Sequence, residues 1–218
     1  MITPVLGLFS LCVFTLLMAE LRGQLTAQYV LKPLAAMGFI ALCVLTGPFE
    51  SLYGQLILTA LTASLIGDIC LLKLGRGKMF LAGMAAFAVA HILYIAALAQ
   101  WGFRLWWLWG LIPSLIIGLL VFRAIRVNVP ENLRLSTPFY CIIIALMGSF
   151  AALATWQSSH GIFAIAAACF IVSDIFVSRH RFTPLADQNF LTGPRNHLLI
   201  TPLYFFAQAL FALSVGLT

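Results

Sequence analysis

The amino-acid sequence predicts an all-α, polytopic membrane protein, a bundle of about eight transmembrane helices. Its composition is the first reason: 63% of the 218 residues are hydrophobic and only 8% are charged, whereas about a quarter of the residues of a soluble domain are charged. The second reason is that the basic residues gather in alternate connections between the apolar stretches. No hydrophilic block is long enough to fold by itself, so we expect one transmembrane domain over residues 1–218.

The predicted helices are apolar stretches of roughly 17 to 22 residues, long enough to cross a hydrocarbon core of about 30 Å at about 1.5 Å per residue. A transmembrane β-barrel would instead show alternation over about ten residues, whereas these stretches are continuously apolar. No Lys or Arg precedes the first stretch, which argues against a signal peptide. The stretches cover residues 3–19, 32–47, 52–73, 78–100, 105–126, 134–155, 159–178 and 197–217.

The basic residues test this helix count, because eight helices assign every connection to one side of the membrane. The opposite side carries only Arg104, so we expect both termini outside and the odd-numbered connections in the cytoplasm. The net charge of +6 then reflects orientation, and nucleic-acid binding is disfavoured because no soluble module or basic helix would present such a patch. The residues on the cytoplasmic side are Arg22, Lys32, Lys73, Arg76, Lys78, Arg123, Arg126, Arg134, Arg179, Arg181 and Arg195.

The cysteines and histidines favour neither disulfides nor a metal site. The cysteines lie inside or at the ends of predicted helices and form no CxxC pair, so disulfides and thiolate ligation are both disfavoured. A zinc-dependent lipid hydrolase would need at least three clustered ligands, whereas His160, His180 and His197 fall on two different sides of the membrane. We expect no metal and no cofactor. The five cysteines are Cys12, Cys43, Cys70, Cys141 and Cys169.

Two aspartates are the main functional candidates, since an ionisable side chain in a membrane is costly and normally faces the bundle interior. Asp68 lies in the third predicted helix, five residues before Lys73, and Asp174 lies in the seventh, five residues before Arg179. Both helices run inward, so we expect the two carboxyl groups at one depth in the cytoplasmic half of the bilayer. A catalytic pair is favoured, while a structural counter-ion to Lys32 or an ion-binding role in transport stays open.

Other polar side chains are expected to wall a cavity beside the aspartates. His91 and Tyr94 share one face of the fourth predicted helix, and Tyr204 and Gln208 share one face of the eighth. These side chains could equally hydrogen-bond neighbouring helices, and Lys32 could extend to the membrane interface without taking part in chemistry. The remaining candidates are Ser64, one turn before Asp68, Tyr140, which opens the sixth helix, and Lys32, which begins the second beside Pro33.

The two halves of the helix set share a simple pattern. Each half places an aspartate on its third helix and a tyrosine on its fourth: Asp68 with Tyr94, then Asp174 with Tyr204. This correspondence raises the hypothesis of a parallel four-plus-four repeat, although only these positions correspond and the flanking residues differ.

Ordered motifs along the chain resemble a known family. They are Lys32-Pro33, Ser64-Leu65-Ile66-Gly67-Asp68-Ile69, then Phe80, Gly83, Phe87, His91 and Tyr94, then Phe170-Ile171-Val172-Ser173-Asp174, and Leu203-Tyr204-Phe205-Phe206-Ala207-Gln208. From about residue 29 to 210 this series resembles the YhhN family of membrane proteins. Animal members of that family are lysoplasmalogenases, which hydrolyse the vinyl ether bond of lysoplasmalogens to a fatty aldehyde and a glycerophospho-ethanolamine or glycerophospho-choline.

The resemblance implies a cofactor-free lipid hydrolase that takes a lysophospholipid from the membrane lipid around it. It implies Asp68 and Asp174 as the catalytic pair, in the cytoplasmic half of a bacterial cell (inner) membrane. The sequence gives no indication of oligomeric state. The substrate-binding set it implies is Lys32, Ser64, His91, Tyr94, Tyr140, Ser173, Tyr204 and Gln208.

The implied chemistry suits two carboxyl groups. Protonation of the vinyl ether β-carbon gives an oxocarbenium ion, water attacks it, and the hemiacetal collapses to aldehyde and alcohol. Two carboxyl groups in a partly desolvated site tend to share one proton, so one aspartate would be the acid while the ionised one stabilises the cation and activates water. The alternatives are a proton-coupled lipid or small-molecule transporter that uses the membrane aspartates, and a lipid-binding or scaffold protein.

Overall fold

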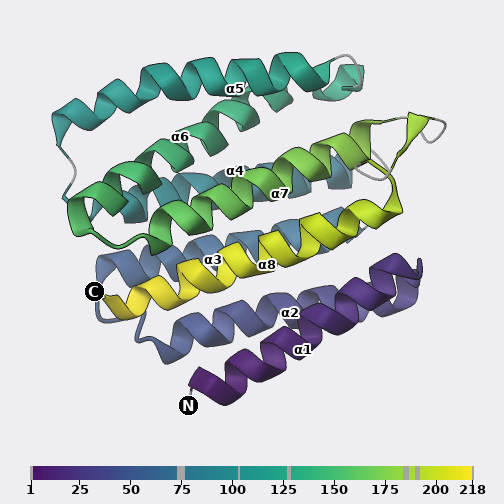
Figure 1. Cartoon of the computed structure of the whole chain (residues 1–218), viewed down its shortest axis with the longest axis horizontal. Helices are drawn as coiled ribbons and strands as arrows, with labels where there is room; N and C mark the ends of the chain where they lie inside the picture. Colours follow the sequence, from purple (N-terminus) through teal and green to yellow (C-terminus); the bar gives the residue numbers. More distant parts are fainter. Residues whose placement is uncertain are drawn as a thin grey trace.

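The computed structural model describes residues 2–72, 77–102, 104–126, 129–183, 187–189 and 192–217, and over these residues the chain forms eight α-helices and no strand (Figure 1). The predicted fold class is confirmed. Lys73 and Arg76, assigned above to the basic side, lie outside the described residues. The helices are α1 (Ile2–Leu21), α2 (Leu25–Leu45), α3 (Leu52–Leu72), α4 (Lys78–Ala99), α5 (Leu111–Ile125), α6 (Ser136–Ser158), α7 (Ile162–Phe182) and α8 (His197–Ser214).

Within the described residues, seven helices are long and apolar enough to cross a membrane. The exception is α5, which has 15 residues and follows the 3-10 helix η1 (Leu105–Gly110), so the stretch predicted as one helix over 105–126 is divided. Short 3-10 helices also stand before α6 and α8 and at the carboxyl end of α8: η3 (Glu131–Leu133), η5 (Pro194–Asn196) and η6 (Val215–Leu217).

Two predicted helix boundaries were wrong in ways that affect the site. Helix α1 continues to Leu21 rather than ending at residue 19, and α2 begins at Leu25 rather than at residue 32. A tight turn joins the two helices because Gly23 adopts a left-handed conformation with φ of 64°. Lys32 was predicted to begin the second helix, but it lies inside α2, beside Pro33. The lost backbone donor of one proline is tolerated in a membrane helix.

Helix neighbours match between the two halves of the chain. Helix α1 packs on α2 as α5 packs on α6, α3 packs on α4 as α7 packs on α8, and α2 packs on α3 as α6 packs on α7. Contacts between the halves correspond in part: α2 packs on α8 as α6 packs on α4, whereas α1 packs on α8 more closely than α5 packs on α4. A parallel four-plus-four repeat predicts this arrangement.

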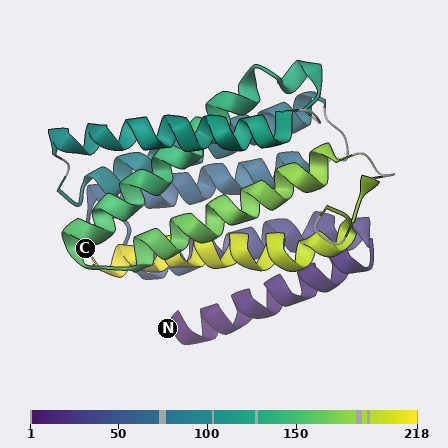
Figure 2. The same cartoon turned by 45° about the horizontal axis from the view of Figure 1, so that its top comes forward.

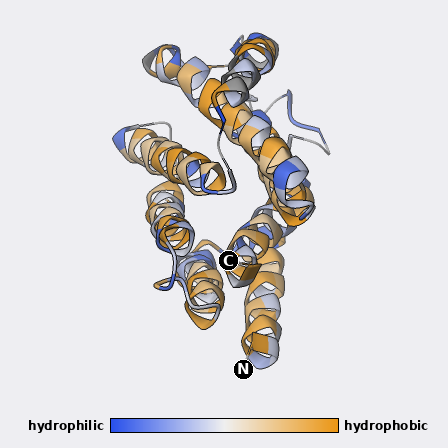
Figure 3. Ribbon diagram, turned by 90° about the vertical axis from the view of Figure 1, so that its left-hand side faces the viewer, coloured by the Kyte–Doolittle hydropathy of each residue, from blue (hydrophilic) through white to orange (hydrophobic). Residues whose placement is uncertain are grey.

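Both termini lie at the same end of the bundle (Figures 1 and 2), as an even number of crossings requires. Seen from that end, the helices carry mostly hydrophobic residues (Figure 3). Many large apolar side chains point outward, among them Leu8, Phe14, Leu120 and Trp156, which are 57% to 83% exposed. Apolar surface on this scale is suited to contact with lipid rather than water.

Candidate active site

A cavity of about 480 Å³ lies inside the bundle, and both Asp68 and Asp174 line it. On α6 its wall extends from Thr137 to Ala152, which is about 22 Å along a helix. The wall near the basic end of the bundle carries ionisable groups, and the wall near the other end carries small apolar groups. The first set is His180, Arg181 and His197, and the second is Gly148, Ala152, Ala164 and Ala168.

Asp68 is buried on α3, with 2% of its surface exposed, and two other helices supply its partners. The Nζ atom of Lys32 on α2 lies 3.2 Å from Asp68 Oδ1. The hydroxyl of Tyr204 on α8 donates to Asp68 Oδ2 at 2.5 Å. An ammonium group and a phenol hydroxyl both favour a charged carboxylate, so this geometry fits an ionised Asp68.

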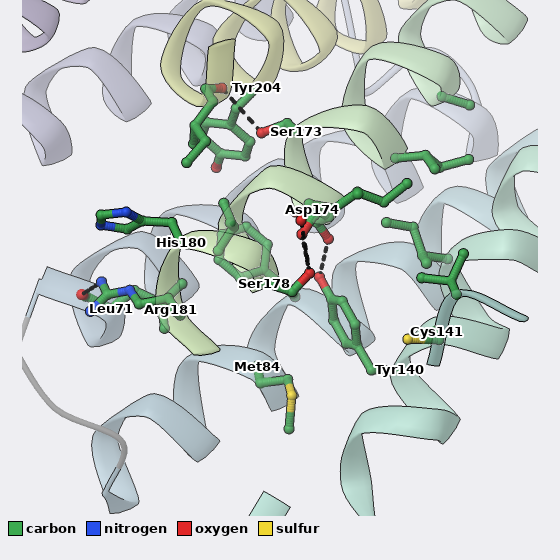
Figure 4. Close-up of a pocket in the computed structure, with 18 of the residues that line it drawn as sticks. Leu71, Met84, Tyr140, Cys141, Ser173, Asp174, Ser178, His180, Arg181 and Tyr204 are labelled. Atoms are coloured by element: carbon green, nitrogen blue, oxygen red, sulfur yellow. Dashed lines mark hydrogen bonds between the residues drawn. The ribbon is translucent and has the colours of Figure 1, made fainter. Parts of the chain in front are cut away.

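Asp174 on α7 faces the cavity and is bound by different groups (Figure 4). The hydroxyl of Tyr140 on α6 donates to Asp174 Oδ2. His91 on α4 places Nε2 3.6 Å from the same oxygen and 3.2 Å from the Tyr140 hydroxyl. Among the described residues, Asp174 is therefore paired with a phenol and an imidazole rather than with a lysine.

The two carboxylates are held in the same way under the four-plus-four correspondence. Asp68 receives one group from α2 and one from α8, whereas Asp174 receives one from α6 and one from α4. These are corresponding helices of the two halves. The carboxyl groups do not hydrogen-bond each other, so the two carboxylates occupy separate positions in the cavity wall.

Several predicted site residues do not line the cavity but are buried between the helices around it. Tyr94 donates to Gln208 Oε1 at 2.5 Å, and Gln208 donates from Nε2 to the Tyr204 hydroxyl at 3.0 Å. This chain ends at Asp68 and fixes the orientation of the Tyr204 phenol. Ser64, His91, Tyr94 and Gln208 are all fully buried and do not line the cavity, whereas Lys32, Tyr140, Ser173 and Tyr204 do.

The Phe170 ring packs against one neighbour of each carboxylate, His91 beside Asp174 and Tyr204 beside Asp68. Its centroid lies 4.7 Å from that of His91 and 5.4 Å from that of Tyr204, each at a steep angle. Ser173, one turn further along α7, donates to the carbonyl oxygen of Ile200 at 3.1 Å and so ties α7 to α8. Aromatic packing and this hydrogen bond help to hold Asp68 and Asp174 at their separate positions.

Glu20 is a buried acidic residue that the sequence reasoning missed. It lies at the end of α1, is 8% exposed and lines the same cavity. The Thr201 hydroxyl donates to Glu20 Oε2, and His197 Nδ1 lies 3.4 Å from that oxygen. Lys32 and Asp68 line this cavity together with Glu20. The sequence does show a single acidic residue directly after the first predicted apolar stretch, but that stretch was ended at residue 19, one residue before Glu20.

Two basic side chains, His180 and Arg181, lie close together at the basic end of the cavity, away from Tyr140 and Cys141 (Figure 4). Arg181 Nη2 donates to the carbonyl oxygen of Leu71 at 2.9 Å, which orients the guanidinium group. The described residues contain no cluster of three or more His, Cys, Asp or Glu side chains that could hold a metal ion.

Comparison with known proteins confirms the resemblance stated above. The model of the YhhN family matches residues 27–215. The pig (Sus scrofa) protein named lysoplasmalogenase TMEM86B is 31% identical over 162 residues, which are 72% of this chain and 62% of that protein. The chain thus spans less than two thirds of the length of this relative. No solved structure matches the chain.

Proposed function

This chain belongs to the YhhN family and is an integral membrane protein, and we propose that it is a lysoplasmalogenase, a hydrolase of the vinyl ether bond of lysoplasmalogens. One observation carries the proposal: two motif aspartates, each bound by a tyrosine, face one cavity that is basic at one end and apolar at the other. The similarity to the pig lysoplasmalogenase supports the same activity.

The cavity suits a lipid with a single chain. The phosphate of the head group would lie toward Arg181 at the basic end, and the alkenyl chain would extend between α6 and α7 past Gly148 to Ala152. Ala152 is twelve residues beyond Tyr140, about 18 Å along α6, which leaves room for a long chain. Ala152 and Ala168 line the cavity and are exposed, so we expect the chain to enter laterally between α6 and α7.

In the proposed mechanism Asp174 is the general acid. It transfers a proton to the β-carbon of the vinyl ether, and the electrons of the double bond form the new C–H bond and leave an oxocarbenium ion. Tyr140 and His91 keep the donor in place and allow it to regain a proton. We assign this role to Asp174 rather than to Asp68 because, among the described residues, only Asp68 is paired with a lysine.

Asp68 is the ionised partner in this mechanism. Lys32 and Tyr204 favour its charged form, so it stabilises the oxocarbenium ion and accepts a proton from the attacking water. The hemiacetal then gives its hydroxyl proton to Asp174 as the aldehyde forms, and Asp68 gives its proton to the departing glycerol oxygen, so both aspartates return to their starting states. One water is consumed, and no net proton is taken up or released.

The proposal is tested with purified protein and lysoplasmenyl-ethanolamine. We expect release of fatty aldehyde, lost in both Asp68→Asn and Asp174→Asn, with Asp187→Asn, an exposed aspartate outside the helices, as the matched control. A transporter would release no aldehyde. Release that persists undiminished in both variants would rule out the two-aspartate mechanism. A cytoplasmic-side active site in a bacterial inner membrane is part of the same proposal, since the basic residues gather at that end.

A further inference from the structure

We propose that Glu20 forms a head-group subsite of this cavity: its carboxylate binds the cationic nitrogen of a zwitterionic lysophospholipid, while the phosphate lies toward Arg181. This inference rests on the proposed function and adds to it a residue that selects the head group. Glu20 lies outside residues 27–215, the segment that the YhhN model matches, so the family motif does not account for it.

Three helix ends meet at the same end of the bundle as Glu20 (Figure 1). Glu20 is the next-to-last residue of α1, and His197 is the first residue of α8. His180 and Arg181 lie in the last turn of α7. The ring centroids of His180 and His197 lie 5.1 Å apart, and His197 Nδ1 lies 3.4 Å from Glu20 Oε2. These contacts place Glu20 and Arg181 at one end of the cavity that both of them line.

One oxygen of the Glu20 carboxylate is available to a ligand. The Thr201 hydroxyl donates to Oε2, and His197 Nδ1 approaches the same oxygen without forming a hydrogen bond. Among the described residues, Oε1 accepts no hydrogen bond, although Glu20 lines the cavity. A carboxylate that is 8% exposed in a membrane helix is costly unless a cation pairs with it, and His197 is a cation only when it is protonated. An ammonium group bound in the cavity would supply the missing donor and the missing charge.

The charges at this end of the cavity match a zwitterion. A phosphate diester is an anion and suits the guanidinium group of Arg181, which the carbonyl oxygen of Leu71 orients. The nitrogen of an ethanolamine or choline head group is a cation and suits the carboxylate of Glu20. A lysolipid that ends in a bare phosphate would bring only negative charge toward this carboxylate. We therefore expect Glu20 to favour zwitterionic lysophospholipids over anionic ones.

The experiment measures binding of alkyl ether lysolipids, which lack the vinyl ether bond, so its result does not depend on hydrolysis. Two lipids with the same alkyl chain, one with a phosphoethanolamine head group and one with a bare phosphate, compete for the purified protein in detergent. Native mass spectrometry gives the ratio of the two complexes. We expect the wild type to prefer the phosphoethanolamine lipid, and Glu20→Gln to reduce this preference about tenfold. Glu131→Gln, whose side chain is 88% exposed, is the matched control and should keep the ratio of the wild type.

A purely structural role for Glu20 predicts a different result. Glu20→Gln preserves the volume of the side chain and an acceptor for the Thr201 hydroxyl, so any loosening of α1 against α8 would affect both lipids alike. The subsite instead predicts opposite changes, weaker binding of the phosphoethanolamine lipid and tighter binding of the bare phosphate. An unchanged ratio in Glu20→Gln, or a wild type without a head-group preference, would overturn the inference. A wild type that shows the preference but releases no aldehyde from the vinyl ether lipid would refute the proposed function and support the subsite.

Should Glu20→Gln fail to fold, the wild type provides the test through changes in the lipid. Acetylation of the ethanolamine nitrogen removes its positive charge, whereas N,N-dimethylation adds similar bulk and keeps the charge. We expect the wild type to bind the dimethylated lipid about tenfold more tightly than the acetylated one, because only the former can form an ion pair with Glu20. Equal binding of the two lipids would contradict a carboxylate subsite for the head-group nitrogen.

Discussion

Replacement of Lys32 by methionine probes the ion pair between Lys32 and Asp68 directly, because methionine keeps an unbranched apolar side chain and removes the ammonium group. Asp68, which is 2% exposed, would then stay buried without its cation. Removing one partner of a buried ion pair costs about 3–5 kcal/mol. For a chain of this size we expect an unfolding temperature lower by about 6–20 °C.

The assay is thermal unfolding in detergent, followed by the fluorescence of the five tryptophans. Lys78→Met is the matched control, because Lys78 is exposed at the start of α4, and it should change the unfolding temperature little. Lys32→Met combined with Asp68→Asn should recover at least half of the lost stability, yet remain inactive. If Lys32→Met unfolds within about 2 °C of the wild type, the stabilising role assigned to the ion pair is wrong.

Three further predictions follow from single contacts. Tyr204→Phe removes the donor to Asp68 Oδ2 and should lower kcat by about 10- to 100-fold, whereas Tyr29→Phe, an exposed control, should not; equal activity in both would refute the role of the phenol. Ala152→Leu narrows the apolar end of the cavity and should slow turnover of long-chain substrates more than short-chain ones; a loss independent of chain length would contradict the proposed pose. Gly54→Ala should lower the free energy of unfolding by about 1–3 kcal/mol, because its Cβ would lie 2.5 Å from the Pro48 carbonyl oxygen; calorimetry showing no loss would contradict this contact.

The helix bundle could be predicted from the sequence because lipid leaves few alternatives for a backbone that must satisfy its own hydrogen bonds. The exact ends of the helices were harder to predict. Pro33 suggested a helix start, but the helix continues through it from Leu25, since apolar residues and the tight turn at Gly23 position α2 earlier. That error placed Lys32 at a helix end, whereas it lies within α2, where it pairs with Asp68.

The candidate site was predicted in part. Asp68 and Asp174 stood out because charges in apolar helices are rare, and both line one cavity. Lys32 was considered as a counter-ion, but the other partners could not be deduced, because hydropathy gives the depth of a residue but not which helices are neighbours. Tyr204 lies 136 residues from Asp68, and Thr201 lies 181 residues from Glu20, so those contacts depend on the packing of α8 against the first half of the chain.

The central claim is vinyl ether hydrolysis by Asp68 and Asp174, and one measurement tests it most directly. Purified wild-type protein, Asp68→Asn and Asp174→Asn are each incubated with matched lysophospholipids that carry a vinyl ether, an alkyl ether or an acyl linkage, and the products are identified by mass spectrometry. We expect fatty aldehyde from the vinyl ether lipid alone, and only with the wild type. Intact vinyl ether lipid after incubation with the wild type, or equal aldehyde from all three proteins, would contradict the account.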